Sequence, residues 1–206
     1  MLAVSRIRSF AGAAALPSAP AKLRILETAN TLFYDDGIRT VGVDRLISAS
    51  SVTKATFYKH YGSKDRLIAE YIGHRHRLEV EWLAGVVETT DDPTRVLRAL
   101  QDSILTAING PGFRGCPFLN AAAEFSDAGH PVRRAVEQHR EWYLDVYEQL
   151  LRRMGHPMPG DAADDLMLAR DGAMAGGYAG DPIASTTALS RAFDRVIAEA
   201  NVSISA

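Results

Sequence analysis

The sequence predicts an all-α protein, and three observations support that prediction. No segment alternates apolar and polar residues as a half-buried strand does, whereas apolar residues spaced near 3.6 recur along the chain. Proline follows an acidic or polar residue at Asp92-Pro93, His130-Pro131 and Asp181-Pro182. Proline suits the first position of a helix because the N–H that it lacks would have no partner there. With 206 residues, 47% of them hydrophobic, the chain can bury a substantial core.

Four helices are expected in the first part of the chain. The first begins near residues 18–20 and ends at Gly37, because glycine commonly follows the end of a helix. The second is short and follows Gly42. The third runs from about residue 53 to residue 60 and is ended by Gly62. Ser63 can then cap a long fourth helix that continues through Val86.

Five further helices are expected beyond residue 89, at about 93–109, 116–126, 131–154, 161–179 and 182–200. The last two are separated by so short a linker that they must form a tight helical hairpin. We therefore divide the chain into a leader at 1–18, a three-helix domain at 19–66 and a larger helical domain at 67–206, with the long fourth helix joining the two domains.

The leader and the cysteine content bear on the compartment. Residues 1–18 resemble a secretory signal only in outline, because their apolar part is mostly Ala and Gly, and we expect a flexible leader instead. No apolar run approaches the roughly 18 residues of a membrane span, so no membrane partner is expected. The one cysteine, Cys116, excludes an intramolecular disulfide and fits a reducing cytoplasm. We expect a cytoplasmic protein.

Charge is distributed unevenly between the two parts of the chain. Residues 1–75 contain 11 Lys and Arg against 6 Asp and Glu, whereas residues 76–206 contain 12 against 19. A basic N-terminal part joined to an acidic remainder favours an anionic partner for the N-terminal part only.

The basic part contains the segment "SSVTKATFYKHYGSKDRL", Ser50 to Leu67. Two short helices joined by a three- or four-residue turn, after a longer supporting helix, are typical of a helix-turn-helix, whose second short helix enters the major groove of DNA. Lysines in this segment can neutralise phosphates, and its Thr, Tyr and His side chains can hydrogen-bond phosphates or base edges. Helical spacing places Phe57 and Tyr61 on the inner face of the second short helix.

Residues 22–72, and above all "VTKATFYKHYGSKDRL", resemble the DNA-binding domain of the TetR family of bacterial transcriptional regulators. The resemblance implies double-stranded operator DNA as the partner. It implies a recognition-helix lysine at Lys54, a small residue for close approach at Ala55 and a phosphate-contacting tyrosine at Tyr58. The expected DNA-binding residues are Thr53, Lys54, Ala55, Thr56, Tyr58, Lys59, His60 and Lys64. Ser51 and Gly42 depart from the family pattern, which usually has Gly in the turn and a Ser or Thr cap.

Aromatic and Met residues recur at helical spacing in the larger domain. Such a stripe is the ordinary pattern of a helical core. The resemblance implies instead that some of these residues line a cavity for a small, largely apolar effector. The candidate effector-binding residues are Phe118, Phe125, Trp142, Tyr143, Tyr147, Met167, Met174 and Tyr178.

The last two helices are expected to form a homodimer interface. Small residues follow one another at helical spacing on the first helix, and an apolar face runs along the second. The resemblance points the same way, to a four-helix interface built from two helices of each subunit. The candidate interface residues are Ala169, Ala173, Gly176, Leu189, Phe193, Val196 and Ile197.

The sequence therefore favours a DNA-binding regulator, most simply a repressor released from a palindromic operator by a small molecule. One alternative is a DNA-bound redox or metal sensor, in which Arg114 would activate Cys116, but the thiol has no resolving partner and the histidines are scattered. Another is an all-helical enzyme, but no nucleophile with a matched base is visible. We expect no catalytic residue, metal or cofactor.

Overall fold

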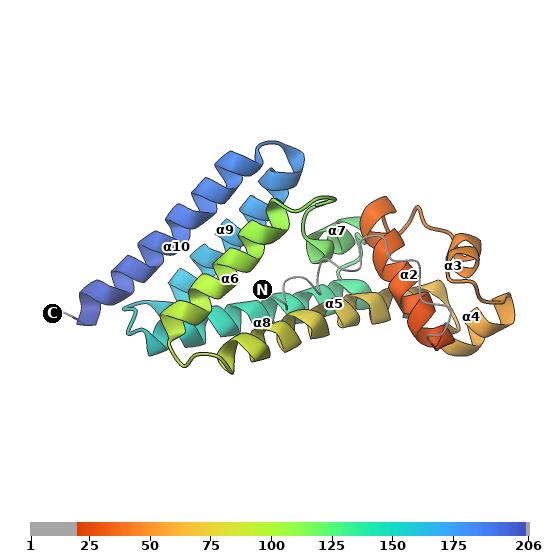
Figure 1. Cartoon of the computed structure of the whole chain (residues 1–206), viewed down its shortest axis with the longest axis horizontal. Helices are drawn as coiled ribbons and strands as arrows, with labels where there is room; N and C mark the ends of the chain where they lie inside the picture. The colour runs from red at the N-terminus through yellow and green to blue at the C-terminus, as the bar shows by residue number, and fades with distance from the viewer. Residues whose placement is uncertain (1–19, 205–206) are drawn as a thin grey trace. The chain divides into compact units, whose positions relative to one another are not determined.

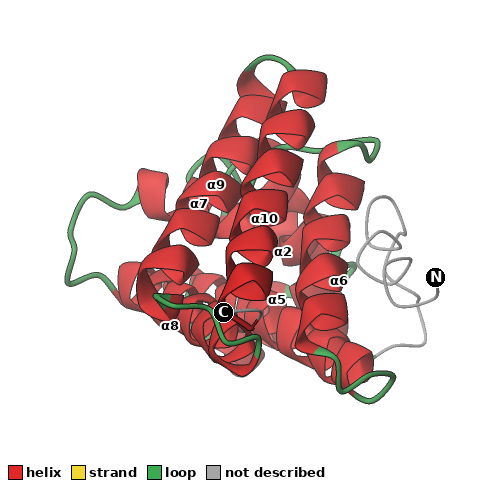
Figure 2. Cartoon of the chain, turned by 90° about the vertical axis from the view of Figure 1, so that its left-hand side faces the viewer, coloured by secondary structure: helices red, strands yellow, loops and turns green. Residues whose placement is uncertain are grey.

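The computed structural model describes residues 20–204, which fold into nine α-helices without any strand (Figures 1 and 2). The all-α prediction is confirmed, and every expected helix is present within a few residues of its expected ends. The expected leader at 1–18 lies outside the described residues. The helices are α2 (Ala21–Asp36), α3 (Val43–Ala49), α4 (Lys54–Tyr61), α5 (Lys64–Val87), α6 (Pro93–Ile108), α7 (Pro117–Glu124), α8 (Pro131–Arg153), α9 (Pro159–Ala179) and α10 (Pro182–Ile204).

Side-chain caps explain several helix starts. The Thr53 hydroxyl accepts a hydrogen bond from the Thr56 N–H at 3.1 Å, and the Ser63 hydroxyl accepts one from the Arg66 N–H at 3.2 Å. Asp181 Oδ1 accepts from the first free N–H groups of α10 at 2.8 and 3.0 Å. These contacts satisfy donors that have no partner within the helix.

The chain forms two compact units that alternate along the sequence. Unit 1 comprises the described residues up to Val80 together with Pro117–Val136, and unit 2 comprises Glu81–Cys116 and the described residues from Glu137 onward. Helices α5 and α8 each begin in unit 1 and end in unit 2. Helix α7 thus packs with the N-terminal helices, which a division at residues 66 and 67 does not anticipate.

Unit 2 is built around α6, α9 and α10, which pack side by side (Figures 1 and 2). Its core contains Leu97, Leu100, Tyr147, Leu166 and Phe193, all fully buried. Helices α9 and α10 approach closely at Gly176, where an added Cβ would lie 2.7 Å from the Ser185 hydroxyl. Within the part of the chain that the structure describes, no helix combines the length and the apolar character needed to cross a membrane.

Candidate functional site

Helix α4 is held in unit 1 by its inner face. Phe57 is 0% exposed and Tyr61 is 4% exposed, as the helical spacing predicts. The Tyr61 hydroxyl donates a hydrogen bond to the Lys22 carbonyl of α2 at 2.9 Å. Burial, with a smaller contribution from Glu70, raises the pKa of Tyr61 to about 12. The hydroxyl therefore remains a proton donor well above neutral pH, and α4 stays tied to α2.

The turn between α3 and α4 is fixed by α2. Arg24 donates from Nε to the Ser50 carbonyl at 3.3 Å and from Nη2 to the Ser51 carbonyl at 3.4 Å. Ser51 has a φ of 53°, a left-handed conformation that favours glycine. This backbone conformation explains why the family pattern has Gly at that place. The serine at this position is therefore strained.

The outer face of α4 is open to solvent. Of the expected DNA-binding residues, Thr53, Lys54, Ala55, Tyr58, Lys59 and His60 are exposed, and Thr56 and Lys64 are half-buried. The Thr53 hydroxyl is engaged as the cap of α4 and lies 2.8 Å from the Thr56 hydroxyl. Lys54, Tyr58, Lys59 and His60 form a polar, basic surface on α4. A helix of 8 residues has a shape that fits the major groove.

Lys64 is placed differently from the lysines of α4. Its ammonium lies 5.9 Å from the centre of the Phe33 ring. Burial lowers its pKa, and the carboxylates of Glu124 and Asp65 act in the opposite direction. A phosphate contact by Lys64 would therefore compete with these acidic neighbours.

Helix α7 contacts the loop that leads from α2 to α3. Glu124 accepts hydrogen bonds from the backbone N–H groups of Ile38 at 2.8 Å and Arg39 at 2.7 Å, one to each carboxylate oxygen. The Arg39 guanidinium lies 5.5 Å from the centre of the Phe125 ring. Sequence reasoning missed Glu124, because only the folded chain brings α7 to a loop more than 80 residues away.

Comparison with known proteins identifies this arrangement. The family model "Bacterial regulatory proteins, tetR family" matches residues 25–71, and the model "Tetracyclin repressor-like, C-terminal domain" matches residues 93–155. The solved structure of SCO4454, a TetR-family transcriptional regulator from Streptomyces coelicolor, is 38% identical with a TM-score of 0.83. The match covers 87% of this chain and 95% of that one. The chain belongs to the TetR family.

Two curated TetR-like regulators are more distant relatives. The HTH-type transcriptional regulator LmrA of Bacillus subtilis is 29% identical over 135 residues, which span 64% of this chain and 71% of LmrA. The HTH-type transcriptional repressor KstR2 of Mycolicibacterium smegmatis is 23% identical over 141 residues, 65% of this chain and 67% of KstR2. TetR-family proteins are DNA-binding transcriptional regulators, typically repressors, that act as dimers and are usually not enzymes.

The expected effector-binding residues fall into both units. Phe118 and Phe125 belong to unit 1, where Phe125 stacks on His130 with ring centres 4.3 Å apart. In unit 2, Trp142, Tyr143 and Tyr147 form consecutive ring contacts with centres 5.0 and 5.5 Å apart. Met167 and Met174 are buried on α9. Tyr178 is 49% exposed, beneath the Arg114 guanidinium.

A buried polar group lies among these apolar residues of unit 2. Arg170 of α9 is 3% exposed, and its guanidinium lies 4.5 Å from the centre of the Tyr143 ring. Asp171 forms ion pairs with both Arg170 and Arg140. Sequence reasoning missed this group, although a signal was present: Arg170 stands between Met167 and Met174, on the apolar stripe of its helix.

The expected dimer-interface residues mostly face the interior of their own chain. Ala173, Leu189, Phe193, Val196 and Ile197 are all buried within unit 2, and Gly176 faces Ser185 of α10. Ala169 is half-buried. Ala169, Ala173 and Leu189 also line an open groove between α9 and α10. The interface at these residues stays a prediction.

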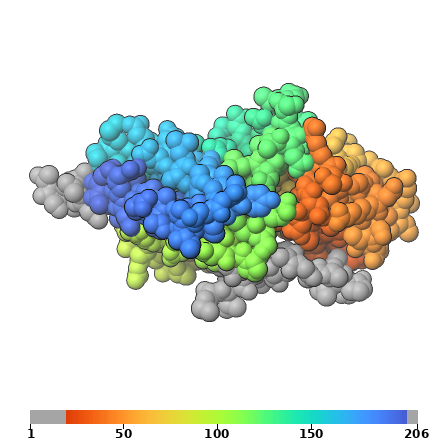
Figure 3. Space-filling model, turned by 90° about the horizontal axis from the view of Figure 1, so that it is seen from above, coloured from red at the N-terminus to blue at the C-terminus, as the bar shows by residue number. Residues whose placement is uncertain are grey.

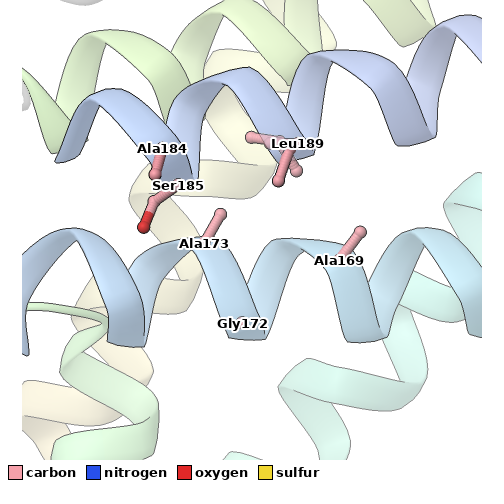
Figure 4. A pocket seen from close by; sticks show the side chains of 7 residues that line it. Ala169, Gly172, Ala173, Ala184, Ser185 and Leu189 are labelled. Atoms are coloured by element: carbon pink, nitrogen blue, oxygen red, sulfur yellow. The ribbon is translucent and has the colours of Figure 1, made fainter. Parts of the chain in front are cut away.

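Two large apolar side chains of α9 and α10 are exposed. Leu168 is 68% exposed and Ile183 is 77% exposed. The space-filling view shows the surface of α10, in dark blue, uncovered (Figure 3). An open groove between the two helices is lined by Ala169, Gly172, Ala173, Ala184, Ser185, Ala188 and Leu189. Figure 4 shows side chains from both helices pointing into this gap. The outer surface, with Leu168 and Ile183, is the part that a partner could reach.

The alternatives of redox and metal sensing depend on Cys116 and on possible groups of metal ligands. Cys116 is 2% exposed and accepts a hydrogen bond from Arg170 Nη1 at 3.7 Å, so its contact is with Arg170. Over the described ranges of the chain, no three His, Cys, Asp or Glu side chains are grouped so that they could hold a metal ion.

Proposed function

We propose that the chain is a ligand-responsive transcriptional repressor that binds a near-palindromic operator as a homodimer. The observation that carries the proposal is the exposed basic face of α4, on a helix anchored by Phe57 and Tyr61. A rigid short helix with exposed lysine, tyrosine and histidine side chains matches the recognition helix of a helix-turn-helix.

Each exposed residue of α4 has a role that suits its chemistry. Lys54 and Lys59 pair with phosphates or with guanine edges, and the Tyr58 hydroxyl donates to a phosphate oxygen. Ala55 brings the backbone close to the DNA because its side chain is small. His60 accepts or donates at a base, at a phosphate or through water.

The dimer would form through the outer surface of α9 and α10. Leu168, Ala175, Ile183, Ala184 and Ala188 are exposed on this surface. Their small or apolar side chains allow helices of a second copy to pack closely, with the groove receiving a ridge of the partner. A two-fold dimer would place its two α4 helices in successive major grooves, about 34–36 Å apart.

The effector would release the operator by favouring a dimer geometry in which that spacing is wrong. It can shift the equilibrium only by the difference between its affinities for the two geometries.

The DNA contacts are tested with operator recovered by genome-wide isolation of bound DNA. Fluorescence anisotropy at fixed salt should show that Lys54→Ala and Tyr58→Phe weaken binding. A lost base contact costs about 1–3 kcal/mol, and a lost phosphate contact lowers the salt dependence by about one unit. Arg152→Ala, which removes an exposed charge of unit 2, is the control. Wild-type affinity for the operator in both α4 variants would contradict the assignment of α4 to the DNA interface.

The dimer surface is tested separately by sedimentation. Leu168→Glu places a charge on the exposed surface and should yield monomers, whereas Leu23→Glu, at an exposed leucine of α2, should remain dimeric. If Leu168→Glu dimerises as tightly as the wild-type chain, the dimer interface lies on another surface.

A further inference from the structure

The turn that joins α3 to α4 contains one strained residue, Ser51. Its φ of 53° is left-handed, a conformation in which the Cβ atom of an L residue crowds the following carbonyl oxygen. Ser51 is the one residue other than glycine, in the described range 20–204, whose φ is positive. Glycine adopts such a φ freely because it has no Cβ atom. Other contacts must therefore keep the turn in this conformation.

The end of α3 explains why the strain falls on this residue. The Val52 N–H donates to the Ile47 carbonyl at 3.3 Å, and the Ser51 N–H donates to the Ser48 carbonyl at 3.2 Å. This pair of hydrogen bonds is a Schellman motif, in which the residue after the helix cap is left-handed and is usually glycine. Ser51 occupies that position. Both bonds use N–H groups of the turn and neither uses its carbonyls.

Arg24 of α2 binds the carbonyls of the turn. Its Nε donates to the Ser50 carbonyl at 3.3 Å, and its Nη2 donates to the Ser51 carbonyl at 3.4 Å. Both donors belong to one planar guanidinium, which is always charged. The two carbonyls belong to the peptide groups on either side of the Ser51 Cα atom. Because peptide groups are planar, holding both carbonyls fixes the two backbone dihedral angles of Ser51.

These dihedral angles set the direction in which α4 leaves α3. Only two residues separate Ser51 from Lys54, the first residue of α4. The last residue of α4, Tyr61, donates its hydroxyl to the Lys22 carbonyl of α2 at 2.9 Å. Helix α2 therefore holds α4 at both ends, and Arg24 provides the contact before its first turn.

We propose that Arg24 is a positioning residue for operator binding, which compensates for the serine that stands where the family pattern has glycine. This inference rests on the proposed function, because it requires that α4 contacts the operator. Arg24 acts through the turn and does not touch the DNA. Without its two hydrogen bonds the strained turn leaves the left-handed conformation, and α4 is correctly oriented in a smaller fraction of the molecules. The apparent affinity for the operator falls by that fraction.

The test is a double-substitution cycle on the full chain, with binding to the recovered operator followed by anisotropy at several salt concentrations. Arg24→Met keeps an unbranched, helix-forming side chain and removes every donor. It should weaken operator binding about tenfold. Adding Ser51→Gly to this variant should restore the affinity to within about twofold of wild type, because glycine needs no contact to hold the turn. The cycle isolates the coupling of Arg24 to Ser51 from every other contact of Arg24.

Two further variants complete the set. Arg77→Met removes an exposed arginine of α5 in the same unit and should bind the operator like the wild-type chain. Arg24→Lys keeps the charge but lacks the planar fork, so it should weaken binding about threefold or more. This second variant carries the test if Arg24→Met does not fold, as judged by circular dichroism.

A direct phosphate contact by Arg24 would give different results. Loss of such a contact lowers the salt dependence by about one unit, and glycine at the turn cannot restore it. Loss of positioning leaves the salt dependence unchanged, because the correctly oriented molecules make the same phosphate contacts. Hydrogen exchange at the Val52 amide, measured without DNA, reports on the turn itself. It should speed up in Arg24→Met and slow again when Ser51→Gly is added.

Three results would overturn the inference: operator binding by Arg24→Met equal to that of Arg77→Met, no recovery on adding Ser51→Gly, or a salt dependence reduced by the loss of Arg24. The variant Lys54→Ala separates this failure from failure of the proposed function. If Lys54→Ala weakens operator binding and Arg24→Met does not, α4 contacts the operator and the role of Arg24 is wrong. If neither variant weakens binding, the proposed function fails and the role of Arg24 fails with it.

Discussion

Glu124 offers a sharp test of how unit 1 is held together. Glu124→Gln keeps the size of the side chain but replaces one accepting oxygen with an amide that donates. One of the two bonds to the Ile38 and Arg39 N–H groups is lost, and the other no longer has a charged acceptor. Hydrogen bonds to charged groups contribute about 1.5–3 kcal/mol each. Since the bond from Ile38 is partly buried and the bond from Arg39 is exposed, we expect a loss of about 2 kcal/mol in the free energy of unfolding.

Thermal unfolding followed by circular dichroism measures this loss. For a chain of this size, about 2 kcal/mol corresponds to a fall of about 4–8 °C in Tm. Native-state hydrogen exchange should speed up at the amides of Ile38 and Arg39, since both lose protection. Glu137→Gln, at an exposed glutamate of α8, is the matched control. If Glu124→Gln unfolds like this control and both amides exchange at the wild-type rate, the reasoning about this contact is refuted.

Three further outcomes follow from unit 1 and from Cys116. The pKa of Tyr61 is raised from 10.0 to about 12, so its contribution is complete below pH 10 and lost as pH rises toward 12. At about 1.4 kcal/mol per pH unit the loss is at most about 3 kcal/mol, and solvent screening at the hydroxyl reduces it. Denaturant titrations should show that Tyr61→Phe removes this alkaline loss, and an unchanged slope would contradict the assignment. Ser51→Gly should raise the free energy of unfolding by about 0.5–1 kcal/mol, because it relieves the left-handed φ of 53°; a lower value would show that the turn is not strained. Cys116, 2% exposed, should react with a disulfide reagent such as Ellman's only after unfolding; rapid reaction of the native protein would support the redox-sensor alternative.

The fold was predictable because its signals are local. Helical periodicity depends on residues within two turns of one another. The prolines that begin α6, α8 and α10 can be recognised from the residues next to them in the sequence. The inner face of α4 was predictable for the same reason: Phe57 and Tyr61 are one turn apart.

The contacts that define the rest of the candidate site depend on pairing between distant segments. Glu124 meets Ile38 across 86 positions, and Arg140 meets Asp171 across 31. In neither pair does the sequence around one residue indicate which distant residue it will contact. An arginine on an apolar stripe signals a buried counter-charge, but it does not say which carboxylate supplies it.

The dimer surface shows another limit of sequence patterns. An apolar stripe has the same appearance whether it packs within one chain or against a second one. Leu189 and Phe193 are buried in the single chain, whereas Leu168 and Ile183 are exposed.

The central claim is that a two-fold dimer places two α4 helices in successive major grooves. The most direct measurement compares the recovered operator with a version that carries about five extra base pairs, half a helical turn, between its half-sites. We predict that anisotropy at fixed salt will show affinity for the extended operator reduced about a hundredfold or more, because the second α4 then faces the wrong side of the duplex. Equal affinity for the two operators would contradict the claim.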